Sequence, residues 1–319
     1  MKASAVAHPI QGLIKYHGLA DERLRLPYHD SISVCTAPLL THTTIEFGDF
    51  PRDTAAIDGS PVAGPAMARI LEVVNSVRTA AKTDRRFRME SRNNFPSNVG
   101  LGASASGFAA LAMATMAAAG TEPDLEAASR FARRGAGSAT RAVTGGFSKW
   151  RMGASDADSF AVQLAGEDLQ MGIVVALVPA YKETDAAHAE APRSPFFQAR
   201  LAEMPRMLAE MELAIRQRDV GKIAMLAERD TMLLHGITMT GPAEMLLWRP
   251  ETLSVMLRVR AMRDHGLPAF FSIDTGATVY VNTFPDRVTE VRQELSGLGV
   301  PTTECRVGGA ARCVDDHLF

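Results

Sequence analysis

The sequence predicts an α+β fold, in which strands and helices follow one another in irregular order instead of in regular strand–helix–strand units. Two kinds of pattern support this prediction. Short segments alternate polar and apolar residues or run continuously apolar, as strands do, whereas longer segments repeat apolar residues every three or four positions, as amphipathic helices do. The chain has 319 residues, and we expect two domains, residues 1–182 and 183–319.

The first half of the chain mixes alternating strands with helices. The predicted strands are residues 31–35, 43–47 and 87–91. The predicted helices are residues 67–81, 103–119 and 125–134. Residues 93–121 carry no charge, but they are dominated by alanine, glycine and serine, so we expect a glycine loop and a buried helix there instead of a membrane span.

The second half contains long helices and apolar strands. The predicted strands are residues 171–178, 269–273 and 277–281, the last two on either side of the sequence DTG. The predicted helices are residues 195–218, 220–234, 251–264 and 285–298. Met204, Met207 and Met211 recur at helical spacing, which predicts a core or interface stripe.

Composition argues against several classes of protein. The formal net charge of −2 is unlike that of a protein with a large basic surface for nucleic acid. Three cysteines without a C-x-x-C pair indicate free thiols in a reducing compartment, which points to the cytoplasm. The histidines are scattered without an H-E-x-x-H motif, and the first residues lack the apolar core of a signal peptide. We therefore expect neither a metal cage made by protein ligands alone nor a secreted protein.

Residues 96–107, with the sequence PSNVGLGASASG, carry the clearest chemical signal. Glycines let a ligand approach the backbone, and the start of the next helix offers unpaired N–H groups and a positive dipole end, which suit phosphate. The segment matches neither the P-loop nor G-x-G-x-x-G, and a tight strand-to-helix turn is the alternative interpretation. The candidate phosphate-binding residues are Pro96, Ser97, Asn98, Gly100, Gly102, Ser104, Ala105 and Ser106.

This segment resembles the phosphate loop of the GHMP superfamily of small-molecule kinases. Together with the flanking residues 94–95 and 108–110, it is most similar to the N-F-P…G-L-A-S-S-A-S-G-F-A-A of the mevalonate-diphosphate decarboxylases. Further blocks resemble this branch in the same order, at residues 14–18 (IKYHG), 26–33 (LPYHDSIS), 137–150 (GSATRAVTGGFSKW), 194–200 (SPFFQAR) and 273–276 (IDTG). The resemblance implies the two-domain GHMP-kinase fold, with the active site in the cleft between the domains.

Departures from the diphosphate enzymes concern the tail of the substrate. Leu19 stands where those enzymes carry lysine, and Ala136 where they carry serine. Without this lysine and this hydroxyl group, the site favours a substrate whose phosphate tail carries less negative charge. The variant blocks, which include residues 7–12 (AHPIQG) and 239–243 (MTGPA), resemble the phosphomevalonate decarboxylase group, whose substrate is mevalonate 5-phosphate.

The resemblance implies an ATP-dependent, Mg²⁺-requiring decarboxylation of mevalonate 5-phosphate to isopentenyl phosphate, in isoprenoid synthesis. Asp274 would lie by the 3-hydroxyl as a base or an orienting acceptor, Lys15 would supply positive charge near the reacting groups, and Arg141 would hold the carboxylate through two parallel bonds. The implied substrate-binding residues are Tyr16, His17, Ser138 and Lys182, and Ser104 is a candidate Mg²⁺ contact. Homodimers are common among the diphosphate relatives, so a homodimer is expected too.

Each of these residues also has a structural interpretation. Asp274 suits a turn before Gly276, Arg141 an ion pair, and Lys15 a solvated strand position. His17 and Tyr16 could be packed core residues, and Lys182 could lie in a solvated loop. For the whole chain the alternatives are a diphosphate decarboxylase, a mevalonate 3-kinase that does not decarboxylate, and a non-catalytic ligand sensor. The presence of Asp274 argues against the kinase.

Overall fold

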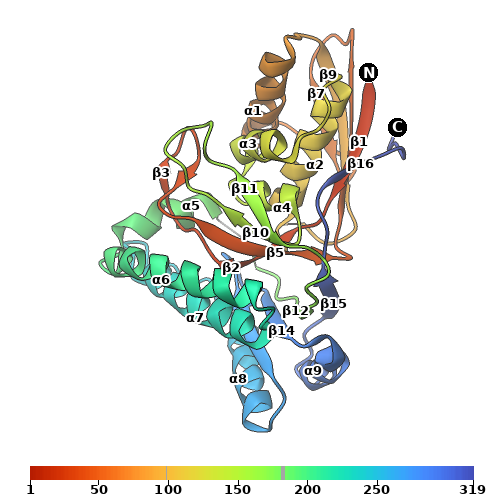
Figure 1. Ribbon diagram of the computed structural model, residues 1–319. Helices are drawn as coiled ribbons and strands as arrows, with labels where there is room; N and C mark the ends of the chain where they lie inside the picture. The colour runs from red at the N-terminus through yellow and green to blue at the C-terminus, as the bar shows by residue number, and fades with distance from the viewer. Residues whose placement is uncertain (98, 181–183) are drawn as a thin grey trace.

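The structure is a computed structural model, and it describes residues 1–97, 99–180 and 184–319. Asn98 and Lys182, two of the predicted site residues, lie outside the described residues. Figure 1 shows helices and strands intermixed along the chain, as the α+β prediction requires. Within the described residues, no helix is long and apolar enough to cross a lipid bilayer.

A six-stranded sheet in the upper part of Figure 1 has the strand order β16-β1-β6-β9-β7-β8. Its strands are β1 (Lys2–Ala7), β6 (Thr41–Gly48), β7 (Thr54–Ile57), β8 (Ser60–Pro61), β9 (Arg86–Asn93) and β16 (Arg312–Val314). The pair β7–β9 is parallel, and the other pairs are antiparallel. Because β16 pairs with β1, the two ends of the chain lie side by side, and Lys2 Nζ donates to the Phe319 carbonyl at 2.9 Å.

A second sheet has the order β11-β10-β5-β15-β12-β14-β13, and β2 also pairs with β5. Its strands are β2 (Ile10–Ile14), β5 (Ser31–Ala37), β10 (Phe147–Trp150), β11 (Ala161–Ala165), β12 (Gly172–Ala176), β13 (Ala269–Ile273), β14 (Val279–Thr283) and β15 (Thr302–Val307), and β3 (Leu19–Asp21) pairs separately with β4 (Leu26–Pro27). The sheet joins strands from both sides of residues 182 and 183, through the pairs β5–β15, β12–β15 and β12–β14. The division of the chain there stays a prediction.

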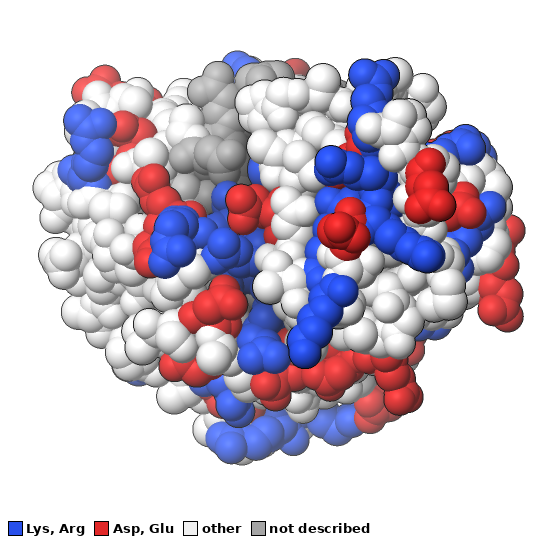
Figure 2. Space-filling model, turned by 90° about the horizontal axis from the view of Figure 1, so that it is seen from above, with Lys and Arg blue, Asp and Glu red and all other residues white. Residues whose placement is uncertain are grey.

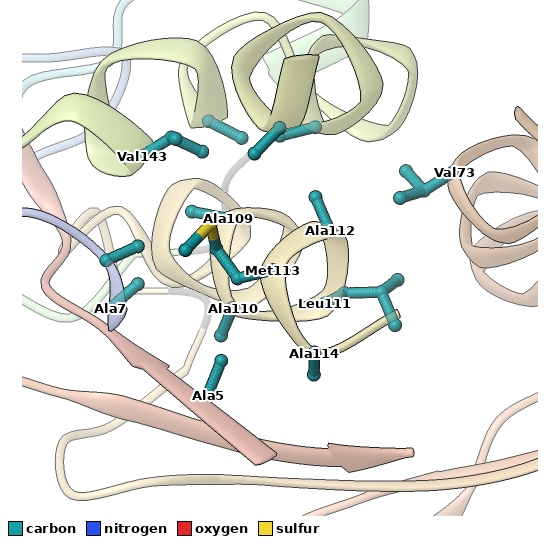
Figure 3. Close-up of a cluster of buried hydrophobic side chains, with 14 of the residues drawn as sticks. Ala5, Ala7, Val73, Ala109, Ala110, Leu111, Ala112, Met113, Ala114 and Val143 are labelled. Carbon is teal, nitrogen blue, oxygen red and sulfur yellow. The ribbon is translucent and has the colours of Figure 1, made fainter. Parts of the chain in front are cut away.

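Helix α2 (Ala103–Ala118) is the centre of the upper core. It packs on β1 and β6 and is covered by α1 (Gly64–Ala81), α3 (Leu125–Gly135) and α4 (Ala139–Thr144). Alanine side chains let these neighbours approach closely. Figure 3 shows Ala5 of β1 below α2 and Ala7 to its left, with Val73 of α1 and Val143 of α4 on other sides. The glycine loop and buried helix predicted for residues 93–121 are confirmed.

Four of the remaining helices pack on the second sheet. They are α6 (Phe197–Arg216), α7 (Val220–Met239), α8 (Pro250–Asp264) and α9 (Val288–Ser296), whereas α5 (Thr184–Glu190) contacts the short 3₁₀ turn that follows it. Helix α7 packs on α6, β13 and β2, and α9 packs on β12 and β15. Met204, Met207 and Met211 of α6 are fully buried, which confirms the predicted methionine stripe.

Most predicted elements are present, with small shifts at their ends. The strand expected over residues 277–281 begins at Val279, and the side-chain hydroxyl of Thr278, just before it, donates to the Val99 carbonyl at 2.5 Å. Helix α7 continues to Met239, beyond the predicted residue 234. The predicted elements did not include β1, β2, β15 or β16, whose partners lie far away in the sequence.

Candidate active site

The three predicted catalytic residues line one small cavity. Lys15 follows β2, Arg141 lies in α4, and Asp274 follows β13. The cavity is also lined by Ile10, Gly12, Tyr16, Gly102, Ser138, His188, Leu234 and Thr275. Strands and helices from both ends of the chain therefore converge on it. Figure 2 shows acidic and basic side chains interspersed over the face seen from above, with basic side chains along the hollow that divides this face.

The Asp274 carboxylate is held by the backbone of β2. The Gly12 N–H donates to Oδ1 at 3.1 Å and to Oδ2 at 3.3 Å. His235 Nε2 donates to the Asp274 carbonyl at 3.1 Å. Burial lowers the pKa of His235 to about 3, helped by the positive charge of Lys15, so the imidazole is neutral near pH 7. N–H donors thus hold both the side-chain carboxylate and the backbone carbonyl of Asp274.

The Lys15 ammonium lies in a pocket of hydroxyl groups. Lys15 Nζ donates to Thr231 Oγ1 at 3.1 Å and to Ser272 Oγ at 2.9 Å. The hydroxyl protons themselves are donated elsewhere, from Thr231 to the Ala227 carbonyl and from Ser272 to the Gly12 carbonyl. Because both oxygens can then only accept, they hold two of the three ammonium protons. Among the described residues the third has no acceptor within hydrogen-bond distance, although the Asp230 carboxylate lies 3.7 Å away, and it can serve the cavity that Lys15 lines.

Charges around Lys15 oppose one another. Burial is the largest influence and lowers the pKa of Lys15, whereas the carboxylates of Asp230 and Asp274 raise it and the Arg200 guanidinium lowers it. Asp230 Oδ2 lies 3.7 Å from Lys15 Nζ, and both side chains are almost completely buried. Lys15 is therefore a desolvated cation, not the solvated strand lysine of the alternative interpretation.

Arg141 is a buried cation prepared for an anion. It is 2% exposed, and its Nε and Nη1 have no hydrogen-bond partner among the described residues. The guanidinium carbon lies 5.5 Å from the ring centre of Tyr16 and 5.8 Å from that of Trp150. Burial lowers the pKa of Arg141 to about 10, so it stays charged at neutral pH. A buried guanidinium with unsatisfied N–H groups suits a planar carboxylate.

The predicted substrate-binding residues fall into two groups. Tyr16 and Ser138 line the cavity, together with His188, whose Nδ1 accepts from the Gly18 N–H at 3.1 Å and whose ring stacks on Tyr16 at 4.9 Å. His17 does not line the cavity: it is 1% exposed, and burial holds the pKa of its imidazole well below the usual range. Its Nε2 lies 3.3 Å from the hydroxyl of Thr238, so His17 has the packed environment of the structural interpretation.

The glycine loop separates this cavity from a larger one. Gly102, with φ at 75°, begins α2 and lies against β2: a Cβ there would come within 3.0 Å of the Ile10 carbonyl. Gly102 lines the first cavity, whereas Ser104 lines a second cavity of about 320 Å³. The second cavity is lined among others by Thr41, Arg69, Ser91, Asn93, Ser97 and Phe108.

The other loop residues are distributed unevenly. Ser104 is exposed in the first turn of α2, and Pro96 is exposed before it. Gly100, Ala105 and Ser106 are buried, and the Ser106 hydroxyl lies 2.6 Å from that of Thr41. Among the described residues, no cluster of His, Cys, Asp and Glu could hold a metal ion by itself.

Comparison with known proteins places the chain in a family. The diphosphomevalonate decarboxylase-like N-terminal domain model matches residues 7–161. Phosphomevalonate decarboxylase from Haloferax volcanii is 48% identical over 99% of this chain and 98% of its own length. The chain belongs to the diphosphomevalonate decarboxylase-like family. Diphosphomevalonate decarboxylase from Homo sapiens is 32% identical over 87% of this chain and 76% of its own length.

Solved structures of this decarboxylase family agree with that assignment. The structure of MDDEF in complex with MVAPP, AMPPCP and magnesium has a TM-score of 0.92 at 28% identity and covers 99% of both chains. Mevalonate diphosphate decarboxylase from Staphylococcus aureus has the same TM-score and identity over 98% of both chains. The α+β fold of the GHMP kinase superfamily, predicted from the motifs, is confirmed.

The sequence analysis missed the residues that hold the predicted ones in place in this decarboxylase-like chain. They are Gly12, Arg200, Asp230, Thr231, His235 and Ser272. Gly12 and Ser272 lie close in sequence to Lys15 and Asp274, and Arg200 is the last residue of the matched block SPFFQAR. The sequence therefore contained some indication that these three residues belong to the site. It contained none for the residues of α7, because only the tertiary structure brings this helix beside β2 and β13.

Proposed function

We propose that this chain catalyses the ATP-dependent decarboxylation of mevalonate 5-phosphate to isopentenyl phosphate, with release of ADP, phosphate and CO₂. The observation that carries the proposal is the convergence of Lys15, Arg141 and Asp274 on one buried cavity. The glycine loop lies between this cavity and the larger one, which has the size of a small-ligand pocket and would hold the nucleotide. The γ-phosphate would then cross the loop to reach the substrate.

Phosphoryl transfer comes first in the proposed reaction. The substrate's 3-hydroxyl oxygen forms a bond to the γ-phosphorus as the bond to ADP breaks. Asp274 accepts the hydroxyl hydrogen bond or its proton, and the third N–H of Lys15 stabilises negative charge on the transferring group. Positioning and electrostatic stabilisation supply most of the catalysis in such a step.

Decarboxylation follows without an electron-sink cofactor. Phosphate leaves carbon 3 with the electron pair of the C–O bond, and the pair that joined the carboxyl carbon to carbon 2 forms the new double bond, so CO₂ is released. Arg141 holds the carboxylate until it is lost, through the Nε and Nη1 groups that have no other partner among the described residues.

Mg²⁺ fits this site as a companion of the nucleotide. Mg²⁺ is usually bound through one or two protein groups plus phosphates and water, and it neutralises charge on the phosphates. The Ser104 hydroxyl, exposed beside the second cavity, is the candidate protein contact. MDDEF, the relative in complex with AMPPCP and magnesium, supports this requirement.

The monophosphate is the proposed substrate for two reasons. The full-length relative from Haloferax volcanii is a phosphomevalonate decarboxylase at 48% identity. Leu19, half-buried in β3, and Ala136, 4% exposed, offer no side-chain donor where the diphosphate enzymes carry lysine and serine.

We also propose a cytoplasmic homodimer with domains at residues 1–182 and 183–319. Light scattering of the purified chain tests the dimer.

The proposal is tested by following CO₂ and ADP release with Mg-ATP on mevalonate 5-phosphate and mevalonate 5-diphosphate in parallel. We expect equal CO₂ and ADP from the monophosphate and little from the diphosphate. ADP without CO₂ would instead indicate a 3-kinase, and turnover of the diphosphate alone would overturn the substrate assignment. Lys15→Met should abolish release, whereas Lys222→Met, which changes a surface lysine on α7, should not.

A further inference from the structure

A buried ion pair holds the backbone of Lys15 where β2 ends. Asp230 of α7 is fully buried, and its Oδ2 accepts from the Lys15 N–H at 2.9 Å. Its Oδ1 accepts from Arg200 Nη2 at 2.8 Å. The same Nη2 donates to the Lys15 carbonyl at 2.7 Å. The backbone N–H and C=O of a single residue, Lys15, are thus both bound by one ion pair, in place of a neighbouring strand.

We infer that Asp230 and Arg200 are positioning residues that together fix the place of Lys15, and that Asp230 keeps its side chain charged. This inference rests on the proposed function, in which Lys15 acts on the transferring phosphoryl group. The pair is buried to the same degree as Lys15: Asp230 and Arg200 side chains are 0% and 2% exposed. Nε and Nη1 of Arg200 have no partner among the described residues, so its hydrogen bonding is directed at Lys15 and Asp230.

Charge on Lys15 matters because of the hydroxyl pocket. Thr231 and Ser272 take two N–H groups of Lys15 Nζ, so a neutral amine would have no N–H left for the substrate. Only the protonated form keeps a third. Asp230, 3.7 Å from Nζ, favours that form, at the cost of burying three charges together.

Among the described residues, four titratable or charged groups on the elements packed around Lys15 influence its charge. Asp230 on α7 and Asp274 after β13 favour its protonation, and Arg200 on α6 opposes it. His235 on α7 is neutral near pH 7 because burial lowers its pKa to about 3. Removing the charge of Asp230 or that of Arg200 should therefore move the pKa of Lys15 in opposite directions, which general structural damage would not do.

The test measures the Lys15 pKa by NMR of ¹³C-labelled lysine side chains, of which the chain has only six. In Asp230→Asn we expect the Lys15 pKa to fall by about one pH unit or more, and in Arg200→Met we expect it to rise. We expect kcat of Asp230→Asn to fall about tenfold or more, with the alkaline limb of its pH profile shifted to lower pH and KM changed less.

Glu228→Gln is the matched control. Glu228 also lies on α7, binds Arg263 at 2.8 Å and accepts from the Phe271 N–H, but no hydrogen bond or ion pair joins it to Lys15 among the described residues. It should leave the Lys15 pKa and the pH profile unchanged.

If Asp230→Asn does not fold, the direction of the Lys15 pKa shift in Arg200→Met tests the inference. An unchanged Lys15 pKa in the folded variants would overturn the inference, whereas absent turnover by a wild-type chain that shows these shifts would overturn the proposed function alone.

Discussion

The backbone N–H of Gly12 donates to both carboxylate oxygens of Asp274, across 262 positions of sequence. On the other side of the same residue, the Gly12 carbonyl accepts from Ser272, which in turn binds Lys15. A Cβ on Gly12 would lie 2.7 Å from Lys15 Cγ and 2.9 Å from Asp274 Oδ1. One glycine in β2 therefore sets the relative position of the proposed phosphoryl acceptor site and its cation.

We predict that Gly12→Ala lowers kcat about a hundredfold while the chain stays folded, because the methyl group must displace Lys15 or the Asp274 carboxylate. Steady-state kinetics and circular dichroism check this. Gly236→Ala is the control, since Gly236 lies within α7 and a Cβ there meets no atom within 4 Å. It should keep its activity and gain about 0.5–1 kcal/mol in unfolding free energy. Equal activity in both variants would refute the proposed role of Gly12.

Asp274→Asn should abolish turnover and leave nucleotide binding nearly intact. The amide can still accept from the Gly12 N–H, but it cannot take the substrate's hydroxyl proton, and the nucleotide is expected in the other cavity. Calorimetric titration with a non-hydrolysable ATP analogue, beside the CO₂ assay, measures both properties. A fully active Asp274→Asn enzyme would sink the assignment of this carboxylate.

Arg141→Lys should lose most activity although it keeps the charge. An ammonium cannot make the two parallel bonds that the buried guanidinium offers through Nε and Nη1. We expect kcat/KM to fall about a hundredfold, which corresponds to about 2.7 kcal/mol. Lys149→Arg, which swaps the same two residue types in the ion pair with Asp30 and Glu212, provides the comparison and should stay active. Normal turnover by Arg141→Lys would argue against carboxylate binding there.

The free energy of unfolding should fall as the pH drops from 6.5 towards 4. Burial is the main cause that lowers the pKa of His29 to about 4, so between these values the unfolded chain takes up a proton that the folded chain excludes. The stabilisation is complete above pH 6.5 and is lost at about 1.4 kcal/mol per pH unit below it.

Urea unfolding at several pH values checks this for the wild type and His29→Asn, since asparagine can keep the hydrogen bond to the Asp30 carbonyl. From pH 6.5 to 5 the wild type should lose about 2 kcal/mol more than the variant. Parallel pH dependences in the two proteins would show that His29 titrates normally in the fold.

Local patterns were sufficient for much of the fold. Helix α1 and strand β13 could be predicted because their periodicity or apolar run lies within one continuous segment. Strand β16 could not, since three residues carry no periodic pattern and its pairing with β1 joins the two ends of the chain. For the same reason the pair β5–β15, which links the halves, had no local signal.

Only part of the candidate site, too, could be predicted from local patterns in the sequence. Lys15, Arg141 and Asp274 lie in motifs that resemble a known family, and the structure brings them to one cavity. The contacts that orient them, such as Asp230 with the Lys15 N–H, depend on side chains that reach across the fold from α7. His17 shows the limit of motif reasoning, because its position in a matched block did not say that its ring faces Thr238 instead of the cavity.

The most direct test of the account uses mevalonate 5-phosphate labelled with ¹⁸O in its 3-hydroxyl group. In the proposed reaction, the γ-phosphoryl group is first transferred to that oxygen, and the bond between the oxygen and carbon 3 then breaks. We predict that each CO₂ released in the presence of Mg-ATP is accompanied by one phosphate that carries the label, as read by mass spectrometry. Release of CO₂ with unlabelled phosphate would contradict phosphorylation of the 3-hydroxyl as the step that drives decarboxylation.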